Sequence, residues 1–160
     1  MSHRSEDTQD KPLEIRRATA QDLAQVVALD LRVTGKTKPE YWADIFERFG
    51  TRRQNERFFL IAAPKGAEIA GLIAGEVRGW EFGSEPCGWI FAVSVDPNQR
   101  EQHIGEQLFR EICSRFREAG ISKIRNMVRR EDQLLMSFFR SEGMVAGPYI
   151  QLELNLDDAP

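Results

Sequence analysis

The stretch from Val93 to Leu108 constrains the fold of this 160-residue chain more than any other. Its sequence, VSVDPNQREQHIGEQL, starts with alternating apolar residues, crosses a polar turn that contains Pro97, and continues with the apolar spacing of an amphipathic helix. A helix that is entered in this way leaves its first backbone N–H groups unpaired and exposes its positive dipole end. The stretch therefore predicts a strand, a tight turn and a helix, with a site for an anion such as phosphate where the helix begins.

This stretch resembles the acyl-CoA signature of the GNAT superfamily of N-acetyltransferases, Gln/Arg-x-x-Gly-x-Gly/Ala after a Val-x-Val-x-Pro strand end. Arg100, His103 and Gly105 fall on the three key positions, and Arg100 and Gly105 fit the pattern. His103 stands where the family usually has glycine, and Glu101 where many members have it, so side chains lie where the backbone would approach the pyrophosphate of coenzyme A. Two interpretations stay open. Either the turn is reshaped, with His103 turned outward or donating a hydrogen bond to phosphate, or the cofactor binds weakly.

A second resemblance lies between Asp132 and Met144, where family members often show Asn-x-x-Ala-x-x-Leu/Phe-Tyr-x-x-x-Gly-Phe. The spacing is retained, but Asp132 replaces the asparagine, Leu135 the alanine and Phe139 the tyrosine. In the family that tyrosine is commonly the general acid that protonates the departing thiolate, and Phe139 cannot donate a proton. Ribosomal-protein alanine N-acetyltransferases carry a catalytic glutamate where spacing places Met127, so that specific activity is not expected.

The resemblance implies a coenzyme A site to which both motifs and the strand before the turn contribute. The implied residues are Val93, Val95, Arg100, Glu101, Gln102, His103, Ile104, Gly105, Glu106, Asp132 and Phe139. In the family the strand that holds Val93 and Val95 separates from the next one, and its backbone pairs with the pantetheine arm. The Val93 N–H would then polarise the thioester carbonyl.

Acetyl transfer to an amine also needs groups that move protons. An alkyl thiol has a pKa of about 8.5, so its thiolate can leave without full protonation. A general acid contributes about 10²–10⁴-fold, whereas positioning reaches effective molarities of about 10⁵–10⁸ M. We therefore expect a slower enzyme, or one in which Tyr149, Ser137 or a bound water replaces the missing tyrosine. Glu85 and Glu76 are the candidate bases, because they lie at strand ends that border the cleft in the family; exposed surface carboxylates are the alternative.

The resemblance extends from about residue 13 to residue 156 and implies the GNAT fold. This is an α+β (mixed α/β) architecture with a central, mostly antiparallel, twisted sheet of six to seven strands flanked by about four helices. Apolar patterns predict strands over residues 13–17, 58–63, 69–77, 87–95 and 121–128, with final strands between 144 and 156. Capping and breaker residues predict helices from 19 to 34, from 39, from 104 to 119, and from 132 to 143. In the first helix the inward-facing side chains are expected to be Leu23, Val26, Val27 and Leu31, and in the second helix Trp42, Ile45, Phe46 and Phe49. The resemblance also implies that one edge of Tyr41 and Trp42 is exposed to the acceptor cleft.

Length and composition limit the classes of protein further. The chain fits one domain, over residues 13–158, after a polar leader at residues 1–12 that we expect to be disordered. It has no apolar run that could span a bilayer or serve as a signal peptide, which predicts a cytoplasmic location and no membrane partner. With two cysteines and two histidines, no metal site is expected.

Charge and motifs together predict an acetyl-CoA-dependent N-acetyltransferase. Residues 99–130 carry eight Lys/Arg and four Glu, a balance that suits the phosphates of coenzyme A, while the net charge of −3 argues against a nucleic-acid partner. The acceptor would be a primary amine of a peptide or small molecule, attacked directly in a ternary complex. The alternatives are a non-catalytic domain that binds coenzyme A or a protein, and an unrelated α/β domain without a cofactor. Monomer and homodimer both stay open, since an exposed last strand could pair with a second copy.

Overall fold

A computed structural model describes residues 12–158, so the leader, apart from Pro12, lies outside the described residues. Its strands are β1 (Leu13–Arg17), β2 (Arg57–Pro64), β3 (Gly71–Arg78), β4 (Cys87–Val95) and β5 (Ile124–Arg125). Its α-helices are α1 (Leu23–Thr34), α2 (Pro39–Thr51), α3 (Ile104–Glu118) and α4 (Gln133–Ser141), and its 3-10 segments are η1 (Ala20–Asp22), η2 (Glu81–Gly83) and η3 (Pro97–Gln102). The chain forms two compact units divided between Met127 and Val128, so α4 belongs to the second unit and all the other elements to the first. No helix within residues 12–158 has both the length and the apolar character needed to cross a membrane.

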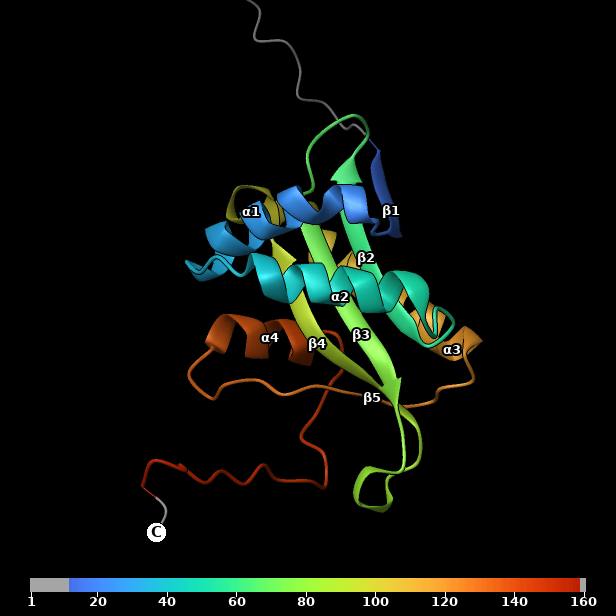
Figure 1. Ribbon diagram of the computed structural model, residues 1–160, viewed down its shortest axis with the longest axis vertical. Helices are drawn as coiled ribbons and strands as arrows, with labels where there is room; N and C mark the ends of the chain where they lie inside the picture. The colour runs from blue at the N-terminus through green and yellow to red at the C-terminus, as the bar shows by residue number, and fades with distance from the viewer. Residues whose placement is uncertain (1–11, 159–160) are drawn as a thin grey trace, which may run out of the picture. The chain divides into compact units, whose positions relative to one another are not determined.

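The five strands form one sheet in the order β1-β2-β3-β4-β5 (Figure 1). Strands β1 to β4 pair antiparallel, and β5 joins β4 in parallel. The mixed architecture, the mostly antiparallel sheet and the four helices are confirmed. The prediction of six to seven strands is wrong: the described residues form five, because the 121–128 segment pairs only at Ile124 and Arg125 and none of the 144–156 segment is in a strand.

Helices α1 and α2 cover one face of the sheet (Figure 1). The apolar cluster between them and the strands comprises Val26, Leu29, Trp42, Ile45, Phe46, Phe49, Phe59, Ile61, Ile69, Leu72 and Ala74. At its centre, Phe59 lies 5.6 Å from Trp42 and 4.9 Å from Phe46, measured between ring centroids. Two predictions need correction. Leu31 was expected to face inward, but it is 46% exposed, and Leu29 is buried in the core instead. Trp42 was expected to expose one edge, but it is only 2% exposed, whereas Tyr41 is exposed.

Helix α3 lies on the opposite face and approaches the strands closely at three glycines. A Cβ atom at Gly71 would lie 2.7 Å from Ile104, one at Gly88 would lie 2.9 Å from the ring of Phe116, and one at Gly75 would meet the same ring at 3.0 Å. These distances are too short for a methyl group, so the absence of side chains allows α3 to pack this close.

Two buried carboxylates fix the N-terminal elements. Asp22 forms the predicted capping box with Thr19, and Arg16 of β1 donates to both of its oxygens at 2.7 and 2.8 Å. This pairing lowers the pKa of Asp22 below its ordinary value. Asp30 of α1, only 2% exposed, accepts a hydrogen bond from Trp42 Nε1 at 2.9 Å and pairs with Lys38 Nζ at 3.0 Å. The carboxylate of Asp30 thereby joins α1 to α2.

Candidate functional site

The outer side of β4, the side away from β3, is paired over only a short length. Within the described residues, β5 is the only strand on that side, and it is in register only with Gly88 and Trp89. The remaining part of β4, residues 90–95, therefore has β3 as its single neighbouring strand. Any backbone group that points outward from this part is available to a ligand that can add to the sheet like a strand.

A bulge in β4 decides which backbone groups point outward. The Gly88 N–H donates to Lys123 on the β5 side at 2.9 Å, while the Asp96 N–H donates to Ala70 on the β3 side at 2.8 Å. Residues an even number of positions apart in a regular strand direct these groups to the same side, so one position must be inserted between Gly88 and Asp96. The register places the insertion at Phe91, because Ala74 pairs with Ala92 while Gly75 pairs with Ile90.

The direction of Val93 and Val95 follows from this bulge. The direction of the backbone groups alternates from one residue of a strand to the next, so Ser94 and Ala92 bond toward β3, as Asp96 does. The N–H and C=O groups of Val93 and Val95 therefore face the outer side of β4. The sequence predicts that these two residues act through their backbone; the structure shows the direction of those backbone groups, and their use by a cofactor stays a prediction. The sequence carries no signal for the bulge at Phe91.

The turn after β4 is organised by Asp96, which is 8% exposed. Its side chain accepts a hydrogen bond from the Asn98 N–H at 3.0 Å, its carbonyl accepts one from the Gln99 N–H at 2.9 Å, and Arg32 of α1 lies 3.4 Å from its carboxylate. This N-cap begins η3, which contains Arg100, Glu101 and Gln102 and leads into α3. The strand, turn and helix predicted from the sequence are thus present.

His103 occupies the junction between η3 and α3 in a left-handed conformation, with φ 55° and ψ 31°. Glycine adopts this conformation without strain, which gives a physical reason for the glycine that the family signature has here. The His103 side chain is 71% exposed, and its Nδ1 lies 3.3 Å from Glu106 Oε2. The His103 side chain is therefore turned to solvent and toward a carboxylate, and whether the cofactor binds weakly at this turn stays open.

The first turn of α3 supplies backbone donors. The first hydrogen bond of the helix runs from Gln107 N–H to His103 O at 3.1 Å. The N–H groups of Ile104, Gly105 and Glu106 lie before this bond and therefore have no acceptor within the helix. Ile104 is fully buried and anchors this turn, whereas Arg100 and Gln102 are exposed. Three adjacent N–H groups at the positive end of a 15-residue helix suit a phosphate group.

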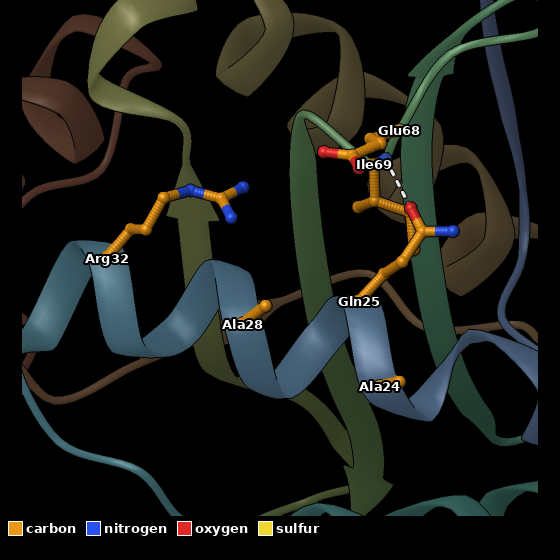
Figure 2. A pocket seen from close by; sticks show the side chains of 6 residues that line it. All are labelled: Ala24, Gln25, Ala28, Arg32, Glu68 and Ile69. Atoms are coloured by element: carbon orange, nitrogen blue, oxygen red, sulfur yellow. Dashed lines mark hydrogen bonds between the residues drawn. The ribbon is translucent and has the colours of Figure 1, made fainter.

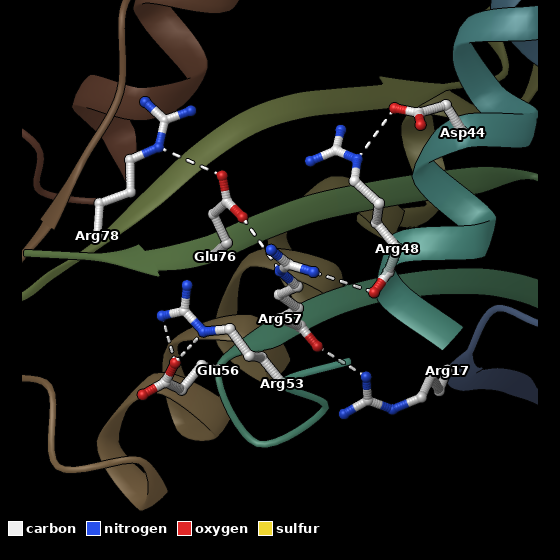
Figure 3. A network of polar contacts seen from close by, with 8 residues as sticks. All are labelled: Arg17, Asp44, Arg48, Arg53, Glu56, Arg57, Glu76 and Arg78. Atoms are coloured by element: carbon white, nitrogen blue, oxygen red, sulfur yellow. Dashed lines mark hydrogen bonds and ion pairs between the residues drawn. The ribbon is translucent and has the colours of Figure 1, made fainter. Parts of the chain in front are cut away.

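The candidate base Glu76 lies in β3, beside the bulged region of β4, within a network of charged side chains (Figure 3). Its carboxylate lies 3.5 Å from Arg57 Nε and 3.3 Å from Arg78 Nε, and its side chain is 16% exposed. Arg78 stacks over Trp89, the cross-strand neighbour of Glu76, at 5.4 Å from the ring centroid. Glu76 is thus a fixed carboxylate on the sheet rather than a flexible surface group.

The other candidate base, Glu85, lies in the loop between β3 and β4 and is exposed. Strand β4 begins two residues after Glu85, at Cys87, and Val93 lies six residues further along it, which corresponds to about 20 Å at about 3.3 Å per residue. The structure therefore does not bring Glu85 close to the outward-facing backbone of Val93. Glu76, whose cross-strand neighbour Trp89 precedes Val93 by four residues, is the nearer of the two along the sheet.

The remaining predicted residues lie in the second compact unit. Asp132 caps α4 by accepting a hydrogen bond from the Leu135 N–H at 3.0 Å, as the motif predicts. Phe139 lies in α4 and forms an edge-to-face pair with Phe138, with ring centroids 5.1 Å apart. Tyr149 follows α4 and is 53% exposed. How these residues contribute to a site stays a prediction.

A shallow pocket of about 220 Å³ lies beside α1 and was not expected from the sequence (Figure 2). It is lined by Ala24, Gln25, Ala28, Arg32, Glu68 and Ile69. Gln25 holds one wall by accepting a hydrogen bond from the Ile69 N–H at 2.8 Å, and Arg32 extends from the other end toward Asp96. Small alanines one helical turn apart leave the hollow, a pattern too common in helices to serve as a signal.

Comparison with known proteins gives one family. The model of the acetyltransferase (GNAT) family matches residues 23–144, which span α1 to the residue after Gly143. No curated protein sequence matches the chain.

Solved structures share the fold at low sequence identity. A transcriptional regulator from Bacillus halodurans C-125 is 20% identical with a TM-score of 0.77, and the alignment covers 91% of this chain and 100% of that one. The aminoglycoside N-acetyltransferase AAC(6')-Iy, solved in complex with CoA, is 13% identical with a TM-score of 0.80, covering 94% and 99%. An acetyltransferase from Trypanosoma brucei is 22% identical with a TM-score of 0.69, covering 91% and 100%.

Proposed function

Because this chain belongs to the GNAT family of acetyltransferases, we propose that it transfers an acetyl group from acetyl-CoA to a primary amine within a direct ternary complex. The observation that carries this proposal is the bulge at Phe91, which directs the backbone of Val93 and Val95 to the unpaired side of β4. An extended amide-containing arm can bond to these groups as a neighbouring strand does. The same strand leads directly into the donors at the start of α3, which suit a pyrophosphate.

The chemistry then follows from the position of the backbone groups. The amine nitrogen attacks the thioester carbonyl carbon, and the Val93 N–H stabilises the oxygen that becomes negative. The C–S bond breaks as the carbonyl re-forms, and the thiolate leaves with a pKa low enough to need no strong acid. The amine loses one proton, which Glu76 accepts directly or through water, while Arg57 and Arg78 hold its carboxylate in place.

Val93→Pro tests the backbone role. Proline removes the N–H that faces outward but no hydrogen bond to β3, so the ladder between β3 and β4 stays intact. We expect amine-dependent release of free thiol from acetyl-CoA to fall by about 10²–10³-fold. Val93→Ala is the matched control, because it shortens the side chain and keeps the N–H. Equal turnover in the two variants, with both folded by circular dichroism, would refute the role of this N–H.

Glu76→Gln tests the proton acceptor. Turnover should fall by about 10²–10⁴-fold while the affinity for acetyl-CoA, measured by calorimetry, stays unchanged. Glu85→Gln serves as the comparison, since the distance along β4 places it away from Val93, and it should retain full turnover. If Glu76→Gln retains turnover, another group removes the proton.

The alternative function, a non-catalytic domain that binds coenzyme A, is favoured by two observations. His103 stands in the turn at a conformation suited to glycine, and α4 carries Phe139 where the family commonly has an acidic tyrosine. Saturable binding of acetyl-CoA without thiol release across a panel of primary amines would favour this alternative over the enzyme.

A further inference from the structure

Arg78, at the end of β3, holds its guanidinium in a fixed plane with one edge unused. Its Nε donates to Glu76 Oε1 at 3.3 Å, and its Cζ lies 5.4 Å from the ring centroid of Trp89. In Figure 3 the contact with Glu76 leaves from Nε, and the two Nη atoms lie at the free end of the side chain. Among residues 12–158 the structure gives neither Nη atom an acceptor, and the side chain is 39% exposed. The edge formed by the two Nη atoms is thus oriented and open to a ligand.

The charges around Glu76 do not balance. Two cations, Arg57 and Arg78, share its one carboxylate, with their Nε atoms 3.5 and 3.3 Å from its oxygens. Arg57 is committed to the protein, because its side chain is only 14% exposed and its Nη1 donates to the Arg48 carbonyl at 3.1 Å. The uncompensated positive charge therefore faces solvent at Arg78.

The open edge of Arg78 lies on the same face of the sheet as the proposed proton acceptor. Side chains two residues apart in a strand share a face, so Arg78 lies beside Glu76. Trp89, the cross-strand neighbour of Glu76, precedes Val93 by four residues, one of which is the extra residue of the bulge at Phe91. This separation corresponds to about 10–13 Å along the sheet at about 3.3 Å per residue.

We propose that the acceptor amine belongs to a molecule that carries a carboxylate about 10 Å from the nitrogen, and that the two Nη atoms of Arg78 bind this carboxylate. The inference rests on the proposed function, since Val93 and Glu76 are the residues that place the amine. A guanidinium edge and a carboxylate pair through two parallel N–H···O bonds, which favours an oriented arginine. A polycationic amine would instead be repelled by the uncompensated charge.

The distance selects a class of acceptor. In a free α-amino acid the amine and the carboxylate share one carbon atom, so they cannot span this separation. An extended peptide advances about 3.3 Å per residue, so a peptide with Asp or Glu as its third or fourth residue places a carboxylate at Arg78 when its N-terminal amine lies near Val93. The N-terminus of such an acidic peptide is the acceptor that this face fits.

The first test compares two amidated peptides, Ala-Ala-Glu-Glu and Ala-Ala-Gln-Gln, as acceptors for acetyl-CoA. We expect kcat/KM to be about 10–100-fold higher for the acidic peptide, as a charge-assisted contact provides. In Arg78→Gln the ratio of the two values should fall to about one. Because Arg78 also holds Glu76, this variant should turn over both peptides more slowly, but only a lost carboxylate contact changes their ratio.

Arg53→Gln is the matched control. It removes an arginine of the same network that is already paired with Glu56, so the preference for the acidic peptide should remain (Figure 3). Equal kcat/KM for the two peptides in the unmodified protein, or a preference that survives Arg78→Gln, would overturn the proposal. Free glutamate should be a poor acceptor, and turnover of glutamate as fast as that of the acidic peptide would show that the assigned distance is wrong.

Peptide binding separates this proposal from acetyl transfer. In calorimetry with coenzyme A present, the acidic peptide should bind the unmodified protein at least about 10-fold more tightly than the amide peptide, and Arg78→Gln should remove the difference. Binding of this kind without thiol release would refute the proposed function and support carboxylate recognition by Arg78. Thiol release with equal rates and affinities for the two peptides would support the function and refute the recognition.

Discussion

Asp22 joins a strand to the following helix through one carboxylate. It caps η1 through Thr19 and receives two hydrogen bonds from Arg16 of β1. The Arg16 hydrogen bonds lower the pKa of Asp22 in the folded protein, and the partial burial of the group opposes them only in part. A carboxyl with a lower pKa in the folded state stabilises the fold above its unfolded pKa of about 3.9 and loses that contribution as the pH falls through the folded pKa.

We therefore expect Asp22→Asn to lower the free energy of unfolding by about 0.5–2 kcal/mol near neutral pH. The difference from the unmodified protein should shrink as the pH falls below about 4, where the native carboxyl also becomes protonated. Urea denaturation at several pH values measures both effects. Asp44→Asn is the control, because the Asp44–Arg48 pair is exposed and should change stability by less than about 1 kcal/mol at any pH. A constant difference between Asp22→Asn and the unmodified protein down to low pH would contradict this account.

Asp30 has a different role, since it satisfies a buried indole. Asp30→Ala leaves Trp42 Nε1 without its acceptor and removes the partner of Lys38, so we expect a loss of about 3–5 kcal/mol in the free energy of unfolding. Lys38→Ala removes only the half-exposed cation, whose side chain is 39% exposed, and should lower it by about 1 kcal/mol or less. Chemical denaturation compares the two. Equal losses would mean that the ion pair, and not the buried hydrogen bond, stabilises the α1–α2 contact.

At the scale of elements, two glycines under α3 make separable predictions. For a Cβ at Gly88 the three nearest atoms would all belong to the ring of Phe116, whereas a Cβ at Gly75 would also lie 2.8 Å from the Trp89 carbonyl oxygen. Gly88→Ala and Gly75→Ala should each lower stability by about 1–3 kcal/mol. Adding Phe116→Leu should recover part of the loss for Gly88→Ala, because the obstacle is a side chain, but should recover less for Gly75→Ala. Thermal unfolding of the two double-mutant cycles measures the difference.

Elements with local signals were predictable from the sequence. The capping box at Thr19, Pro39 at the start of α2, and the apolar periodicity of α3 are set by neighbouring residues, and the structure contains all three. Leu31 shows the limit of this reasoning: the helix was expected, but its buried face was rotated so that Leu29 and Asp30 point inward instead. Asp30 accepts a hydrogen bond from Trp42 of α2, and the periodicity of residues within α1 carries no information about a partner on another helix.

Elements that depend on distant partners were not predictable. The 121–128 segment has a strand pattern, but its strand ends after two residues because its length is set by pairing with β4. The bulge at Phe91 belongs to the register between β3 and β4, and neither strand encodes it alone. For the site, the motif around Arg100 predicted the strand, turn and helix that the structure contains, while the role of these residues stays a prediction. The distance of Glu85 from Val93 became visible only once the direction of β4 was known.

At the scale of the whole molecule, binding of acetyl-CoA should raise the stability of the fold. A ligand that binds only the folded state contributes about 2.7 kcal/mol at 100 times its dissociation constant. For a chain of this size we expect Tm to rise by about 5–11 °C. Pantetheine, which lacks the pyrophosphate, should give a much smaller rise at the same concentration. No rise with acetyl-CoA at millimolar concentration would mean that His103 and Glu101 close the turn to phosphate.

The bulge in β4 also affects how this site can change over time. Its donors are backbone groups that every residue except proline possesses, so an alanine scan along β4 would keep them all. Deletion of Phe91 would make Ile90 and Ala92 consecutive and remove the bulge, and regular alternation would still direct Val93 outward and Asp96 toward β3. The side chains along β4 can therefore diverge widely, and even the bulge residue can be lost, as long as proline does not replace Val93.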